Sequence, residues 1–179
     1  LTAGNFLLPE EDINGQTWTV QTIQTGGAKF FATGSKKESN FHVVDSEHRG
    51  LAALDAVTAI VIAEGYATAD TLSQALSCPV VAAFDSGNLL KVAQVLQNKY
   101  PQKPIVIAGD DDLTQESING KNPGKEKAME AAQLVNGAVV LPIFAPGEQM
   151  SQQLSDFNDL ANKSVLGIEA VKRQVGSVV

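Results

Sequence analysis

The sequence contains little cysteine, few basic residues and no long hydrophobic run. Its single cysteine, Cys78, excludes an internal disulfide framework and a cysteine-rich zinc site, and we expect a buried, inert thiol. The longest uncharged, mostly apolar stretch, residues 137–147, contains two prolines and falls well short of the roughly 20 residues that cross a bilayer. The chain also opens on Leu1 without the cationic start and apolar stretch of a signal peptide. We therefore expect a fragment of a larger cytoplasmic protein with no membrane span.

Basic residues are outnumbered, 13 against 20 acidic ones, and the net charge is −7. A nucleic-acid binder normally needs a cationic face that neutralises phosphates, so this balance weakens that interpretation. The acidic side chains gather, however, in one loop at Asp110, Asp111, Asp112 and Glu116. A divalent cation bound in that loop would reverse the local sign of the charge, so the total does not decide the question.

Two patterns divide the 179 residues, of which 44% are hydrophobic. Residues 1–45 are typical of short strands and turns, and Asn14-Gly15 is a strong hairpin signal because both central positions of that turn need positive φ. From residue 46 to residue 179, apolar strands alternate with helical patterns, which predicts a parallel sheet covered by helices. We therefore expect an α/β domain over 46–179 with a small N-terminal antiparallel β subdomain over 1–45.

Apolar runs and helical spacings place the individual elements. Strands are expected over 59–63, 79–84, 105–109 and 138–141. Helices are expected from Ser46 through Val57, over 68–76, over 89–96 with Asn88 as a cap, after residue 123 and over 165–175. Residues 41–44 are expected to complete the small sheet, 113–123 to form a polar loop, and Gly137 to end a helix. Trp18, Phe30 and Phe31 are expected in the core rather than as platforms for bases, and His42 and His48 in structural or surface roles.

Two of the expected parallel strands end in carboxylates, at Glu64 and at Asp110–Asp112. Ligands of open α/β sheets bind beyond the carboxyl ends of the strands, so these acids can meet at one edge. Asp110 and Asp112 are two residues apart, which sends both side chains to the same side of an extended backbone. Such a pair suits a hard cation such as Mg²⁺, while Asp111 would point toward solvent or a second ion.

This geometry predicts phosphate chemistry. A cation held by Asp110 and Asp112 would bind phosphate oxygens and stabilise the charge that develops on them. Glu64 would accept a proton from an attacking hydroxyl or add a metal ligand, and Gly65 would let a phosphate or metal approach closely. The simpler alternatives are a solvated acidic loop and a glutamate that only caps the next helix.

Two segments resemble the Toprim domain that bacterial primases, topoisomerases and related nucleases share: Glu64–Ala69 after an apolar strand, and Asp110–Asp112. Two more resemble its primase branch: Asn122–Lys125 before an alanine-rich helix, and Asp156–Asp159. Within that group the chain is most similar to primases of conjugative plasmids and other mobile elements. The resemblance implies a Toprim-like fold and metal-dependent synthesis of short RNA primers on single-stranded DNA from nucleoside triphosphates, in plasmid replication or conjugative transfer.

The resemblance also implies roles for single residues. Glu64 would be the general acid/base, and the cofactor would be Mg²⁺ or Mn²⁺ on Asp110 and Asp112, with Asp111 beside them. Asp156 and Asp159 match a second acidic motif. Lys29, Lys36 and Lys37 would face template or nucleotide. Apart from the resemblance, Gly65 would allow a close approach, and Lys125 lies near a helix N-terminus that attracts phosphate. Primases usually need further domains, so the expected partners include other domains of a larger parent protein.

Three alternatives stay open on the sequence. A Toprim-type nuclease would use the same carboxylates and metal for hydrolysis. A non-catalytic Toprim module would bind DNA or protein within a larger transfer protein. The string Asp110–Thr114 also fits the Asp-x-Asp-x-Thr nucleophile motif of haloacid-dehalogenase-type phosphatases, although only 65 residues follow it.

Overall fold

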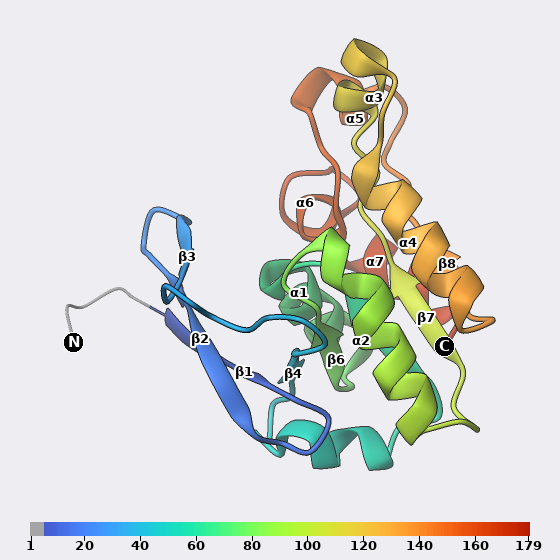
Figure 1. The fold of residues 1–179 in the computed structure, drawn as a ribbon. Helices are drawn as coiled ribbons and strands as arrows, with labels where there is room; N and C mark the ends of the chain where they lie inside the picture. The colour runs from blue at the N-terminus through green and yellow to red at the C-terminus, as the bar shows by residue number, and fades with distance from the viewer. Residues whose placement is uncertain (1–5) are drawn as a thin grey trace.

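The computed structural model describes residues 6–179, which form two sheets (Figure 1). The small sheet is antiparallel, with the order β1-β2-β3, and consists of β1 (Phe6–Glu11), β2 (Thr17–Ile23) and β3 (Lys29–Phe31). The main sheet has the order β4-β6-β5-β7-β8. Its strands are β4 (His42–Val44), β5 (Ile60–Ala63), β6 (Val80–Ala82), β7 (Ile105–Ala108) and β8 (Ala138–Val140). All neighbours in it are parallel except β4, so the expected α/β fold with a small antiparallel sheet is confirmed.

The central strands β5 and β7 have the same sequence, Ile-Val-Ile-Ala, and every residue in them is buried. Parallel strands covered on both faces have such continuous apolar runs, because neither face meets water. Ala63 pairs in register with Ala82 of β6 and Ala108 of β7. The residues that follow these three strands therefore emerge at one edge of the sheet.

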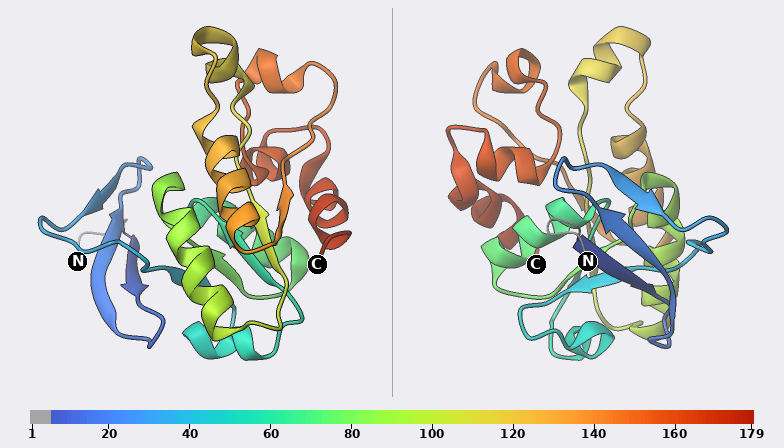
Figure 2. Two further views of the ribbon diagram at one scale, coloured as in Figure 1. Left: turned by 45° about the vertical axis from the view of Figure 1, so that its right-hand side comes forward. Right: turned by 90° about the vertical axis from the view of Figure 1, so that its left-hand side faces the viewer.

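Two layers of helices cover the main sheet (Figures 1 and 2). On one face α1 (Tyr66–Leu76), α6 (Phe157–Asn162) and α7 (Gly167–Gly176) pack on Val61 and Ala63. On the other face α2 (Ser86–Lys99) and α4 (Pro123–Leu134) pack on Ile60 and Ile62. This division follows from the alternation of side chains along a strand. Two short helices, α3 (Leu113–Asn119) and α5 (Glu148–Gln152), extend beyond the carboxyl edge (Figure 1).

Polar contacts at α2 hold the loops beside the small sheet. The buried Asn88 side chain donates to the carbonyls of Asn40 (2.8 Å) and Ala83 (2.9 Å) and accepts from the Ser39 N–H (2.9 Å). Lys99, near the end of α2, donates to the Ile13 carbonyl at 3.1 Å. The loops on both sides of the small sheet are thus held against one helix.

Residues 41–44 do not complete the small sheet as expected. β4 pairs antiparallel with β6 as the edge strand of the main sheet, and its strand pairing with the small sheet is limited to an isolated bridge from Phe41 to Glu11. Val43 and Val44 are buried there, because they cover the edge of the main core. The division of the chain near residue 45 stays a prediction.

Several local expectations are also wrong. The segment after Ser46 forms only a short 3-10 helix, η1 (Gly50–Asp55), and the polar loop 113–123 contains α3, whose side chains are all at least partly exposed. Asp85, not Asn88, caps α2, since its side chain accepts the Asn88 N–H at 3.0 Å.

Gly137 is also not the left-handed residue after α4, because Asn136 takes that conformation with φ of 51°. Gly137 is needed for a different reason. A Cβ at this position would lie 2.4 Å from the Ile105 carbonyl oxygen, so only glycine fits.

The aromatic residues of the small sheet are another correction. Trp18 is 45% exposed and Phe30 is 53% exposed, so neither belongs to the core. In β2 the alternation turns Thr19 and Gln21 inward instead, and both are buried. The outer face of the small sheet therefore presents aromatic rings to solvent.

Candidate active site

Three of the expected acids line one open pocket of about 310 Å³ at the carboxyl edge of the main sheet. Glu64 follows β5, while Asp110 and Asp112 follow β7. Ser86 at the start of α2 and Asn122 at the start of α4 also line this pocket. The parallel register of β5 and β7 is what brings these acids together across more than 40 residues of sequence.

Glu64 is held at the start of α2. The backbone N–H of Ser86 donates to its carboxylate. Burial raises the pKa of Glu64, and the negative charge of Asp85 raises it further, while Lys29 lowers it. A carboxyl group in this environment is a stronger base than an exposed glutamate, and so it is suited to accepting a proton.

Asp110 is the most perturbed acid of the site. Burial, followed by the charges of Glu64 and Asp156, raises its pKa to about 8. Its Oδ1 is buried and has no hydrogen-bond partner. A buried carboxylate oxygen without a donor is costly in a folded protein, and a bound cation would remove that cost.

Asp111 and Asp112 have different surroundings from Asp110. Asp112 caps α3, where its Oδ1 accepts the Gln115 N–H at 2.9 Å, and it also lines the pocket. Asp111 accepts a hydrogen bond from the Asn122 side chain at 2.8 Å and forms an ion pair with Lys125 at 3.6 Å. The Asp111 carboxylate is therefore neutralised by protein groups.

The second acidic motif lies at the start of α6. Asp156 caps this helix by accepting the Asp159 N–H at 2.7 Å, and the hydroxyl of Thr68 also donates to it. Burial raises the pKa of Asp156, and its charge in turn raises the pKa values of Glu64 and Asp110. Asp159 is buried and forms a 2.6 Å ion pair with Lys163. Asp156 thus faces the site, while Asp159 is paired.

Lys29 brings a positive charge from the small sheet to this edge. Its Nζ lies 3.7 Å from the position that a Cβ would take on Gly65, and its charge lowers the pKa values of Glu64 and Asp110. Gly65 itself has φ of −109° and room for a side chain, so the turn does not require glycine. That Gly65 lets a phosphate or metal approach the backbone closely stays a prediction.

The neighbouring lysines Lys36 and Lys37 point to different partners. Lys36 Nζ lies 5.0 Å from the ring centre of exposed Trp18. Lys37 Nζ lies 4.5 Å from the ring centre of Phe31 and 3.5 Å from Asp85, and its charge acts on buried Glu10. Lys36 is thus available on the outer face, whereas Lys37, although 40% of its side chain is exposed, is paired with Asp85.

Within residues 6–179, no group of three or more His, Cys, Asp or Glu side chains is arranged to hold a metal ion. The acids still suit Mg²⁺ or Mn²⁺, because Mg²⁺ commonly binds one or two carboxylates and fills its other positions with water and phosphate oxygens. The unpartnered Oδ1 of Asp110 and the free side of Asp112 in the pocket offer such a pair.

A Toprim domain model matches residues 59–165, which include Glu64 and the three aspartates of the acidic loop. That range covers more than half of the chain. This chain belongs to the Toprim domain family. The match favours the Toprim interpretation of Asp110–Thr114 over the phosphatase one, because it extends over the strands on both sides of the motif.

The relatives of this Toprim chain include two Escherichia coli proteins named DNA primase TraC. They are 40% and 41% identical to it over alignments of 228 positions that cover 96% of the chain. The chain spans only 16% and 21% of their lengths.

Solved structures with the same fold include two primase fragments. The primase fragment of the bacteriophage T7 primase-helicase protein matches with a TM-score of 0.62 and 17% identity, covering 100% of this chain and 64% of that one. The DnaG primase catalytic domain bound to single-stranded DNA matches with a TM-score of 0.61 and 15% identity, covering 98% of this chain and 52% of that one. At such identities the likeness establishes the fold of the Toprim chain.

Sequence reasoning missed two groups of the Toprim site. Asp85 and Ser86 reach Glu64 through the turn between β6 and α2, where Phe84 takes a left-handed φ of 73°. A left-handed aromatic residue cannot be inferred from composition. Asn122 had a visible signal, because an asparagine before Pro123 is typical of a helix N-cap.

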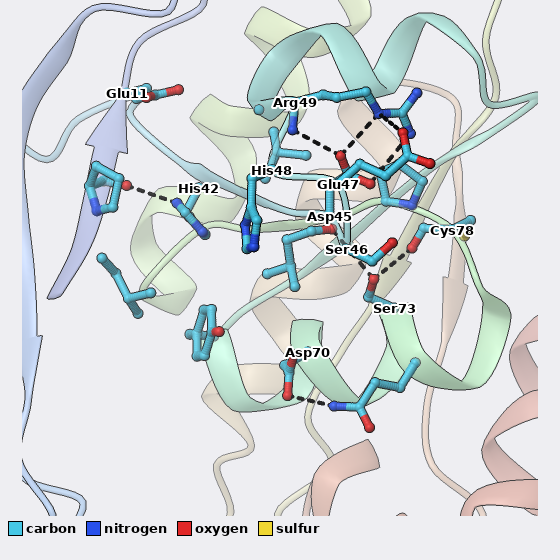
Figure 3. A pocket seen from close by; sticks show the side chains of 18 of the residues that line it. Glu11, His42, Asp45, Ser46, Glu47, His48, Arg49, Asp70, Ser73 and Cys78 are labelled. Atoms are coloured by element: carbon cyan, nitrogen blue, oxygen red, sulfur yellow. Dashed lines mark hydrogen bonds and ion pairs between the residues drawn. The ribbon is translucent and has the colours of Figure 1, made fainter. Parts of the chain in front are cut away.

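A larger cavity of the Toprim chain lies elsewhere (Figure 3). It measures about 780 Å³ between β1, β4 and α1, and none of the pocket acids named above lines it. Its acids Asp45 and Glu47 are paired with Arg49 at 3.2 and 3.1 Å, and His42 Nδ1 lies 3.0 Å from the Pro9 carbonyl oxygen. Burial lowers the pKa of His42, in keeping with a structural role.

No helix in residues 6–179 is long and apolar enough to cross a membrane.

Proposed function

We propose that this chain is the catalytic Toprim part of a DNA primase that joins ribonucleotides into short primers on single-stranded DNA. The observation that carries the proposal is that Glu64, Asp110 and Asp112, at the ends of β5 and β7, line one pocket, and that Asp110 Oδ1 has no hydrogen-bond partner. Two relatives named DNA primase TraC support the reaction. A setting in plasmid replication or conjugative transfer is part of the proposal. We also propose that the primase acts in the cytoplasm and that this chain is part of a larger multidomain protein.

Asp110 and Asp112 would hold the divalent cation, Mg²⁺ or Mn²⁺. The cation would supply positive charge to the phosphate oxygens of a nucleoside triphosphate. Glu64, steadied by the Ser86 N–H, would take the proton from the attacking hydroxyl. Lys29, which lies over Gly65 beside these acids, would bind a phosphate group of the nucleotide or template.

The outer face of the small sheet would contact the template. Exposed Trp18 and Phe30 offer rings on which bases can stack, and Lys36 lies over the Trp18 ring. Lys37 would contribute less to DNA affinity than Lys36, because its ammonium is already paired with Asp85. Lys125 would likewise contribute less because it is paired with Asp111.

The test compares Glu64→Gln with Glu130→Gln, a matched change on the exposed side of α4. Primer synthesis is measured in the full-length protein with ribonucleotides, Mg²⁺ and a single-stranded DNA template, and Mn²⁺ binding is measured separately. We expect Glu64→Gln to lower kcat by at least about 100-fold, since general base catalysis contributes that much. We expect it to keep Mn²⁺ binding, and Glu130→Gln to match the wild type in both assays.

Full primer synthesis by Glu64→Gln would remove Glu64 from the proposed role. Strand cleavage without primer synthesis in the wild type would favour the nuclease alternative. Binding of DNA without either reaction would favour a non-catalytic module.

Asp111→Asn separates a metal ligand from a structural aspartate. Its carboxylate is bound to Asn122 and Lys125, so we expect the variant to bind Mn²⁺ within about three-fold of the wild type. Asp112→Asn, measured beside it by calorimetric titration, should bind Mn²⁺ at least about ten-fold more weakly, because a ligand is lost. Equal losses in both variants would make Asp111 a ligand, as the sequence alone allows.

A further inference from the structure

Asn122 connects three parts of the proposed site through one buried side chain. It is 3% exposed and caps α4. Its Nδ2 donates to Asp111 (2.8 Å) and to Glu116 in α3 (3.0 Å). Its Oδ1 accepts the backbone N–H of Asp112 at 3.2 Å and that of Lys125 at 3.4 Å. One amide thus joins the acidic loop, α3 and α4.

The chemistry of these contacts requires an amide. Two carboxylates each need a donor, and two backbone N–H groups each need an acceptor. Aspartate at position 122 would place a third negative charge beside Asp111 and Glu116. Serine would keep an acceptor for the helix cap but lose the donors to both carboxylates. Asn122 is therefore more than a cap.

Hydrogen bonds on both sides of Asn122's contact fix the backbone that carries the proposed cation ligands. The peptide of Asp111 is held on both sides, because its N–H donates to the Ser155 carbonyl and its carbonyl accepts from the Gln149 side chain, each at 2.7 Å. Asn122 holds the next N–H, that of Asp112. A Cβ on Gly124 would lie 3.0 Å from the Asp110 Cβ, so the first turn of α4 packs directly behind Asp110.

We infer that Asn122 is a positioning residue, which turns Asp110 and Asp112 toward the pocket and keeps the carboxylates of Asp111 and Glu116 turned away from it. This inference rests on the proposed metal-dependent function. Groups that orient metal ligands from behind typically change metal affinity or activity by 10–100-fold when they are lost. Asn122 acts here through the backbone of the loop and through its two carboxylate partners.

The experiment uses the whole chain and Mn²⁺ alone as the probe. Asn122→Ser keeps the cap oxygen, so we expect its melting temperature without metal to stay close to that of the wild type. We expect its Mn²⁺ affinity in calorimetric titration to fall by at least about ten-fold. In primer synthesis the concentration of Mn²⁺ for half-maximal rate should rise more than kcat falls. Asn162→Ser, on the exposed side of α6, is the matched control and should bind like the wild type.

A second variant tests how Asn122 acts. Asp111→Asn and Glu116→Gln added to Asn122→Ser remove both carboxylates that would lose their amide donor, so Mn²⁺ affinity should recover to within about three-fold of the wild type. Wild-type affinity in Asn122→Ser, or no recovery in the triple variant, would overturn the inference alone. A wild-type chain that binds no Mn²⁺ would overturn the proposed cation site and the inference with it.

Discussion

Asp110→Asn should make the metal-free protein more stable while it removes primer synthesis. The carboxylate of Asp110 is buried, its Oδ1 has no hydrogen-bond partner, and the charges of Glu64 and Asp156 repel it. Replacing it with a neutral amide removes that repulsion, and we expect the free energy of unfolding at pH 8 to rise by about 2 kcal/mol. The same change removes a proposed cation ligand, so we expect primer synthesis to fall by at least about 100-fold.

Urea denaturation in the presence of a chelator measures the first effect, and primer synthesis by the full-length protein measures the second. Asp111→Asn is the control, because the neighbouring carboxylate is satisfied by Asn122 and Lys125 and has no such cost to remove. A loss of stability in Asp110→Asn would show that this carboxylate has a partner within the fold. Unchanged primer synthesis would exclude Asp110 from the reaction.

Glu10→Gln should stabilise the protein at high pH and have little effect at low pH. Glu10 lies in β1 with 0% exposure, and neither carboxylate oxygen has a hydrogen-bond partner. Burial raises its pKa from 4.5 to about 7, the charge of Lys37 lowers it, and that of Asp85 raises it again. Lys37, which is also paired with Asp85, is therefore an incomplete counter-ion.

The sign of the effect follows from the raised pKa. Below pH 4.5 the Glu10 carboxyl is protonated in both the folded and the unfolded protein, so its ionisation costs nothing. Above pH 7 it is ionised in both, and the folded state then carries the whole cost of burying the charge. At roughly 1.4 kcal/mol per pKa unit, that cost approaches about 3 kcal/mol.

Denaturation of Glu10→Gln at pH 4.5 and pH 8.5 checks this, with Glu11→Gln, the next residue of β1, as the control. We expect the gain in free energy of unfolding over the wild type to grow between the two values for Glu10→Gln only. An equal gain at both pH values would mean that the ionisation of Glu10 has no part in it. A loss at pH 8.5 would mean that the Glu10 carboxylate is well paired in the folded protein.

The fold could be inferred from the sequence where burial on both faces leaves a simple signal. The repeated Ile-Val-Ile-Ala of β5 and β7 marks two central parallel strands, and the acids directly after them mark a shared edge. The sequence does not assign β4 to the right sheet, since three residues with two valines fit either sheet equally well. α3 cannot be recognised in the sequence, because none of its residues is buried and its apolar residues therefore do not recur at helical spacing.

The candidate site could be inferred only as far as its strand ends. Glu64, Asp110 and Asp112 follow from the order of the strands, and the structure brings them to one pocket. The partners of Asp111 and Lys37 do not follow, because they come from segments that meet only through tertiary packing, at Asn122 and at Asp85. Neither spacing nor charge pattern distinguishes a free carboxylate or lysine from one that is already paired.

The central claim is that the acids after β7 hold one divalent cation that faces Glu64 at the end of β5. The most direct measurement is the anomalous difference map of a crystal of this protein soaked in Mn²⁺ at a saturating concentration. We predict a peak in the pocket, in contact with Asp110 or Asp112 and facing Glu64. A peak only at other acids, such as Asp45 and Glu47, or no peak at all, would contradict the account.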